Sequence, residues 1–241
     1  MGGSLSHKPR NEPAHRISHL FGRVVVDRGV PESAYDGSMR SRPKHPRSDQ
    51  QLVQIVDAAV ADAARRSGAW LLCRPGCSQC CVGVFAISRL DAQRLREGLE
   101  NLQVIDPERA TRVRARARQS VEKLSKDFPG DCSTGLLEES EEAEERFAVF
   151  ANDEPCPALD PGTGTCDLYH SRPMTCRVFG PPVRSGEGIG VCELCFVGAT
   201  PEQIAACELK VDPDALEAPL LRRLERESGV RGQTLVAFAL R

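Results

Sequence analysis

The sequence has few aromatic residues, no long apolar run and no excess charge of one sign. Aromatic residues make up 5% of its 241 positions, so few large rings are available for a core. No stretch approaches the roughly 18 consecutive apolar residues that cross a membrane, and residues 1–18 lack the apolar segment of a secretory signal. The formal net charge of -2 provides no field that would attract nucleic acid or a membrane surface. We therefore expect a cytoplasmic protein that binds neither.

Cysteine is too sparse for a disulfide scaffold. The chain contains 11 cysteines among 241 residues. That is about half the density of a disulfide scaffold, which has more than roughly 8–10% cysteine. The 40% apolar and 27% charged residues are ordinary for a globular protein of this length. In a reducing compartment, clustered thiols are more often metal ligands or redox groups than structural disulfides.

Composition divides the chain into three regions. Residues 1–48 hold five prolines and more basic than acidic residues, which predicts a largely disordered basic arm. Residues 49–198 are expected to form a cysteine-cluster domain with a helical hairpin inserted in it. Residues 199–241 are expected to form a helical tail that packs on this domain. The basic arm and the acidic segment 138–145 are the two candidate surfaces for a protein partner.

Apolar periodicity predicts a mostly helical protein. Helical spacing is evident in residues 49–67, 88–102 and 106–128, and the last two segments predict a helical hairpin. Residues 147–150 look like a short strand, and the turn cluster 161–164 predicts a hairpin or knuckle. The expected fold is mostly α, with an irregular cysteine-rich metal-binding core of short strands and knuckle loops. No named superfold is indicated.

The 106–128 helix is rich in arginine, at positions 109, 112, 114, 116 and 118. Such a face suggests RNA binding. The acidic segment that follows offers a simpler interpretation, because an acidic helix lying beside the basic one would neutralise it. We therefore expect an internal charge partner for these arginines.

The cysteines fall into three clusters whose spacing is typical of metal sites. Four thiols occur between Cys73 and Cys81, and Pro75-Gly76 supplies the tight turn that they need. Pairs of cysteines two residues apart can chelate one ion while neighbouring amides point at the sulfurs. The candidate metal ligands are Cys73, Cys77, Cys80, Cys81, Cys156, Cys166, Cys176, Cys192 and Cys195.

These thiols suffice for two four-cysteine sites, with Cys192 and Cys195 competing for the last position. Neighbouring side chains of an extended segment point to opposite sides, so Cys80 and Cys81 can serve different sites. A single site with further thiols around it stays open. The spacing also allows a thioredoxin-like dithiol or a radical S-adenosylmethionine cluster, but the strands that those folds require are missing from the pattern. Cys132 and Cys207 are interpreted as small apolar residues.

The ordered set of motifs resembles the YkgJ-type cysteine-cluster family, known by its CxxCxxCC-like signature. The resemblance covers about residues 70–196. Its elements are Cys73 to Cys81, Cys156-Pro157-x-Leu159, Cys166-x-Leu168-Tyr169, Arg172-Pro173 and Cys176-Arg177. It implies chelation of zinc or iron. One branch of the family resembles flagellin lysine N-methylases, which implies an iron–sulfur cluster.

A buried thiolate site needs positive charge and hydrogen-bond donors near its sulfurs, because four thiolates around a divalent ion carry a charge of -2. Arg172 lies between Cys166 and Cys176, Arg177 directly follows Cys176, and Tyr169 is expected to pack beside these arginines. The function expected is that of a metal-chelating protein, with zinc or iron as cofactor. The alternative is an iron–sulfur enzyme or electron carrier, perhaps modifying a protein side chain. The sequence contains no glycine-rich phosphate loop and no clear His/Asp pair, so it leaves open whether the protein is an enzyme.

Overall fold

The computed structural model describes residues 48–185, 188–210 and 215–241. The expected basic arm lies outside the described residues, apart from Ser48. Helices are the main elements of the described chain. Their bounds are α1 Asp49–Ser67, α2 Arg89–Ile105, α3 Pro107–Leu124, α4 Glu141–Val149, α5 Met174–Val178, α6 Pro201–Ala206, α7 Glu217–Ser228 and α8 Val236–Leu240.

Side-chain caps start the longer helices where the sequence predicts them. The Ser48 hydroxyl accepts from the N–H of Gln51 at the start of α1. At the start of α2, Ser88 and Asp91 form a reciprocal capping box. Between α2 and α3, the Asp106 side chain caps the start of α3 by accepting from the Arg109 N–H. Such caps satisfy N–H groups that have no partner inside the helix.

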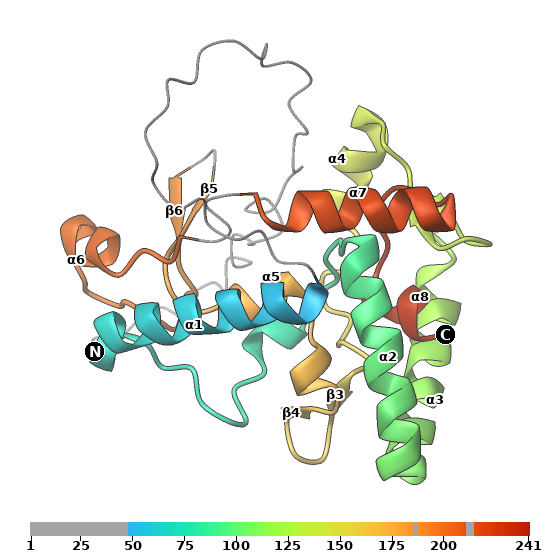
Figure 1. Cartoon of the computed structure of the whole chain (residues 1–241), viewed down its shortest axis with the longest axis horizontal. Helices are drawn as coiled ribbons and strands as arrows, with labels where there is room; N and C mark the ends of the chain where they lie inside the picture. The colour runs from blue at the N-terminus through green and yellow to red at the C-terminus, as the bar shows by residue number, and fades with distance from the viewer. Residues whose placement is uncertain (1–47, 186–187, 211–214) are drawn as a thin grey trace, which may run out of the picture.

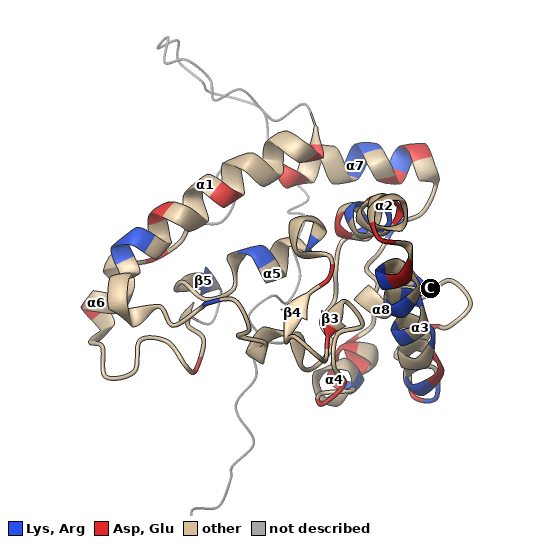
Figure 2. Cartoon of the chain, turned by 90° about the horizontal axis from the view of Figure 1, so that it is seen from below, with Lys and Arg blue, Asp and Glu red and all other residues tan. Residues whose placement is uncertain are grey.

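Helices α2 and α3 form the expected antiparallel hairpin, and α8 packs against both (Figure 1). Their shared core is apolar and includes Leu95, Val113 and Leu240, all at most 2% exposed. A second core joins α1 to α5 and α7 through residues such as Leu52, Val178 and Leu220. Helices α1 and α7 follow one another along one side of the molecule (Figure 2). Cys156 and Cys166 pack against the first core, whereas Cys192 and Cys195 belong to a separate apolar cluster with Trp70 and Phe196.

The described strands form three short antiparallel pairs. They are β1 Gly130–Asp131 with β2 Leu136–Leu137, β3 Leu159–Asp160 with β4 Thr165–Cys166, and β5 Val183–Ser185 with β6 Gly188–Gly190. The β3–β4 pair confirms the hairpin predicted around residues 161–164. The fold class is therefore as expected: the described chain is mostly helical, and its few short strand pairs and loops include several of the cysteine-bearing segments.

The strand predicted for residues 147–150 is wrong, because residues 147–149 belong to α4. The Ser140 hydroxyl caps this helix by accepting from the Ala143 N–H, and three glutamates occupy its first turn. Negative charge is favourable at a helix N-terminus. These signals outweigh the preference of its last, aromatic and β-branched residues for a strand. In the described part of the chain, no helix has the length and apolar character needed to cross a membrane.

Candidate metal-binding site

Four cysteines from the two ends of the cysteine-rich region act on one another and are called the first thiol group: Cys73, Cys77, Cys192 and Cys195. Partial burial, together with the charges of Cys195, Cys192 and Cys77, raises the pKa of Cys73 to about 12. Burial likewise raises the pKa of Cys192, with Cys195 and Cys77 adding to it. Thiols that disfavour one another's ionisation lie close together.

Ring stacking and backbone bonds bring the two ends of this group together. The rings of Trp70 and Phe196 stack with their centroids 6.5 Å apart. The Phe196 N–H donates to the Trp70 carbonyl at 3.0 Å, and the Leu72 N–H donates to the Cys195 sulfur at 3.4 Å. Segments that are about 120 residues apart in sequence thus meet at the sulfurs.

Two glycines allow the close approach at Cys73 and Cys77. The predicted turn is present, since the Cys77 N–H donates to the Arg74 carbonyl at 2.9 Å and Gly76 has a φ of 89°. Gly180 has a φ of 122°, and a Cβ there would lie 2.8 Å from the Cys73 sulfur. Only glycine accommodates both this conformation and this contact without strain.

The remaining five candidates form the second thiol group: Cys80, Cys81, Cys156, Cys166 and Cys176. A hydrogen bond from Cys81 lowers the pKa of Cys80 to about 7, and the same bond raises the pKa of Cys81. Burial raises the pKa of Cys156 to about 12, with the charges of Cys166 and Cys80 contributing. Burial also raises the pKa of Cys176 well above its usual value, and the charges of Cys156, Cys80 and Cys166 add to this effect.

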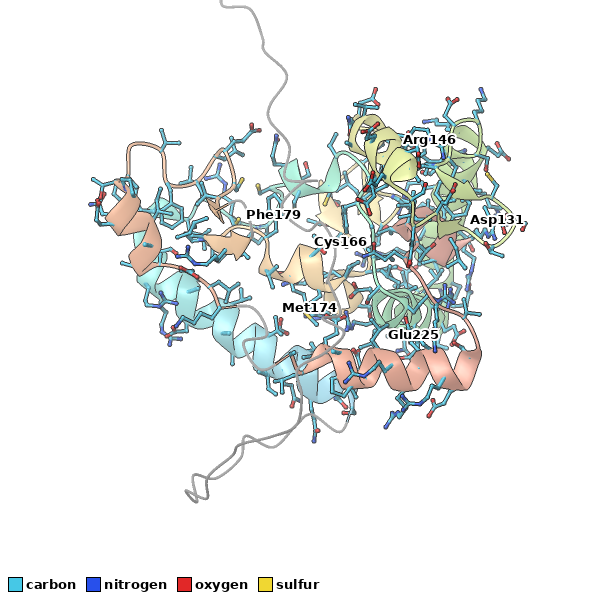
Figure 3. The ribbon with its side chains drawn as sticks, turned by 90° about the horizontal axis from the view of Figure 1, so that it is seen from above. Asp131, Arg146, Cys166, Met174, Phe179 and Glu225 are labelled. Carbon is cyan, nitrogen blue, oxygen red and sulfur yellow. The ribbon has the colours of Figure 1, made fainter. Side chains whose placement is uncertain are left out.

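Three local structures assemble the second group. The Cys156 N–H donates to the Cys81 carbonyl at 2.7 Å, which joins the first cysteine cluster to the second. In the β3–β4 hairpin, Cys166 pairs with Leu159, three residues after Cys156. Cys176 comes from the short helix α5. Figure 3 shows Cys166 and Met174, the first residue of α5, in the middle of the molecule.

Backbone N–H groups point at sulfurs of both groups. Cys156 accepts from the amides of Ala158 and Leu159, Cys166 from Leu168 and Cys192 from Leu194. Each of these bonds favours the thiolate over the thiol. The arrangement is the one expected of cysteines that bind metal through their charged form.

Among the described residues, no three His, Cys, Asp or Glu side chains already stand in a metal-holding arrangement. The two groups are therefore defined by which thiols act on one another. Their composition fits zinc or iron, because thiolates are the ligands that select these soft metals.

Arg172 lies beside the second thiol group. Its charge contributes to lowering the pKa of Cys80 and opposes the burial that raises the pKa of Cys166. The guanidinium stacks on the Tyr169 ring at 3.8 Å and donates to the Tyr169 carbonyl at 3.2 Å. Tyr169 is 56% exposed, so its ring packs on Arg172 at the surface and not in the core. It supports Arg172 from the solvent side.

Arg177 points away from the sulfurs, toward α1. One of its nitrogens donates to both carboxylate oxygens of Asp57 at 3.0 Å, and the other donates to the His170 carbonyl. Its Nε is buried and has no hydrogen-bond partner among the described residues. Arg177 thus ties α5, which carries Cys176, to α1.

Cys132 and Cys207 belong to neither group. The Cys132 thiol donates to the Ser125 carbonyl at 3.4 Å, and the Cys207 thiol donates to the Arg66 carbonyl at 3.3 Å. Cys207 shares an apolar cluster with Cys192 and Cys195, but its sulfur is directed at α1.

Two buried carboxylates next to the second group were not identified from the sequence. Asp91 is 3% exposed and accepts from the Met174 N–H at 2.8 Å. The side chain of Asp167 is 2% exposed and is bound by Arg109 and Arg116. The position of Asp167 directly after a candidate ligand was the one available signal. The internal partner expected for the α3 arginines exists, but for these two arginines it is Asp167 and not the acidic helix.

The fold and the two thiol groups define a cysteine-cluster, metal-chelating protein. A family model described as "CxxCxxCC: Putative zinc- or iron-chelating domain" matches residues 72–195. This match covers more than half of the chain, and the protein belongs to that family. A search of the curated proteins and a search of the solved structures found no match.

Proposed function

We propose that the protein binds two metal centres through thiolates, one at each thiol group. The observation that carries the proposal is the division of nine thiols into two sets, each assembled from distant parts of the chain. The first set has the four thiolates of a tetrahedral site. The second has five thiols, so four bind and one stays next to them.

The metal is zinc or iron, and the first centre holds segments that have little core of their own. The first group joins residues 70–77 to residues 192–196, which lie in an apolar cluster of modest size. Binding energy at such a site is folding energy, because the site does not exist in the unfolded chain. The chemistry that a metal supplies here is a stable cross-link between thiolates.

Metal and acid-labile sulfide analysis of protein purified without oxygen tests the proposal. We expect two equivalents of metal per chain, without sulfide if the metal is zinc. Stoichiometric sulfide with iron would instead favour the iron–sulfur alternative at one or both groups. Protein that stays free of zinc and iron after anaerobic reconstitution with either would overturn the proposal.

A further inference from the structure

The arginines of α3 have a task that the two metal centres alone do not explain. We infer that Arg116, together with Asp167, is a positioning residue of the second thiol group, and that Asp91 has the same role at Cys176. The inference rests on the proposed function. It makes the α2–α3 hairpin the scaffold of one metal centre and not a separate nucleic-acid-binding face.

Asp167 anchors the segment that runs from Cys156 through the β3–β4 hairpin to Cys166. Its Oδ2 accepts from Arg116 at 2.5 Å and its Oδ1 accepts from Arg109 at 2.5 Å. Its own N–H donates to the Ala158 carbonyl at 2.7 Å, across the hairpin. A carboxylate that is this deeply buried is tolerated only when it is paired. Asp167 therefore fixes the chain directly after Cys166.

Arg116 binds this segment at two points, one directly after Cys156 and one directly after Cys166. While Nη2 binds Asp167, Nε donates to the Pro157 carbonyl at 2.9 Å, directly after Cys156. A guanidinium offers several donors in a rigid plane, so one side chain sets the distance between two acceptors. Through these contacts Arg116 holds the backbone beside Cys156 and Cys166 at a fixed spacing.

Asp91 does the corresponding work at α5. This helix has five residues and no side-chain cap of its own, and so short a helix has little stability alone. The Asp91 carboxylate accepts from the first N–H of α5 and is itself held by Arg94 at 2.5 Å. Arg94 in turn binds Asp49 of α1 through two nitrogens. The position of Cys176 thus depends on a series of linked charged side chains, Asp91, Arg94 and Asp49, that connects α5 through α2 to α1.

These contacts account for arginines that would otherwise suggest RNA binding. Figure 2 shows basic positions distributed along α3. Arg109 and Arg116 are engaged by Asp167, and Arg114 donates to Gln103 on α2. Arg118 is exposed on the same helix and provides a matched control.

The test measures Co²⁺ affinity of each thiol group separately in the full chain, by competition with a chelator and by sulfur-to-cobalt absorption. A Cys73→Ser/Cys77→Ser background leaves the second group, and a Cys166→Ser/Cys176→Ser background leaves the first. We expect Arg116→Gln to weaken the second group about 10- to 100-fold, the usual cost of losing an outer-shell partner. Arg116→Gln should leave the Co²⁺ affinity of the first group within about threefold of the parent value. The control Arg118→Gln should leave the affinity of each group within about threefold, when it is measured in either background.

Asp167→Asn provides a second variant that keeps the shape of the side chain. Because Arg116 and Asp167 act as a pair, their effects should not add. The variant with both Arg116→Gln and Asp167→Asn should bind Co²⁺ at the second group about as weakly as the weaker-binding single variant. Asp91→Asn should also weaken the second group alone. Equal losses at both groups, or second-group affinity within threefold of the parent, would overturn the inference while leaving the two-centre proposal intact. If the parent second group binds no Co²⁺, both the two-centre proposal and this inference fail.

Discussion

The two thiol groups are built by different means. Two of the thiols in the first group, Cys192 and Cys195, lie in an apolar cluster with Trp70 and Phe196, and turns and backbone bonds bring Cys73 and Cys77 to them. The second lies between helices, where Asp91 and Asp167 are buried and paired with arginines. Packing on helices that have their own core can hold the second group without metal. The first group has no such scaffold, so it should depend more on its metal.

The largest expected effect comes from removing the metal. Residues 68–78 and 188–200 should lose protection from hydrogen exchange almost completely, because metal binding supplies their folding energy. Helices α2 and α3 should keep protection through their apolar core, and the segments of the second group should fall between. Exchange measured by mass spectrometry before and after chelation checks this order. Uniform loss over the whole described chain, or no loss near Cys73, would contradict it.

Gly180→Ala should damage the first group selectively. The new Cβ would approach the Cys73 sulfur to 2.8 Å in a backbone conformation that suits glycine, at a cost of about 1–3 kcal/mol. We expect metal affinity of the first group to fall by about tenfold, with the second group unchanged.

Gly229→Ala is the matched control for that change. Gly229 also has a positive φ, of 69°, but its Cβ would meet nothing within 4 Å. The control should lower stability without changing the affinity of either group. Equal effects of the two variants on metal affinity would show that the contact with Cys73 is unimportant.

Raising the pH should destabilise the metal-free protein. Burial raises the pKa of Cys156 to about 12 from an ordinary value of 9.0, so folding favours its neutral form. This contribution is present below pH 9 and is lost as the pH rises toward 12. Urea unfolding at about pH 8 and about pH 10.5 measures it. Metal-bound protein should show a smaller decline, since its thiolates are already charged; an equal decline would contradict this explanation.

The smallest effect is expected at the cysteines outside both groups. Cys132→Ser and Cys207→Ser should each leave the metal content unchanged, because these thiols donate to backbone carbonyls, a role that a hydroxyl can fill. Metal analysis of the purified variants checks this. A loss at Cys207 equal to that in Cys195→Ser would place Cys207 in the first group.

The helices were largely predictable because their signals are local. Ser48, Ser88 and Asp106 cap helices close to where the apolar periodicity begins, and the turn at Pro75-Gly76 follows from its residues. Residues 147–149 were misjudged because aromatic and β-branched residues favour strands, whereas the cap at Ser140 decides the outcome. Here the helix cap and the strand preference point to different structures, and the sequence pattern alone does not show which of the two is stronger.

The pairing of distant groups was less predictable. The sequence identified nine thiols and suggested two sites, but the partition depends on the Trp70–Phe196 stack and on the bond between Cys156 and Cys81. Arg177 was expected beside the sulfurs, and it binds Asp57. Such contacts join residues that are more than 70 positions apart. They depend on tertiary packing, which composition and spacing do not encode locally.

Metal stoichiometry by native mass spectrometry tests the central claim most directly. The parent protein, reconstituted without oxygen, should carry two metal centres. Cys73→Ser/Cys77→Ser and Cys166→Ser/Cys176→Ser should each carry one, and the combined variant none. If either double variant alone lost all of its metal, or if the parent never bound more than one centre, the nine thiols would form one site, and the division into two groups would be wrong.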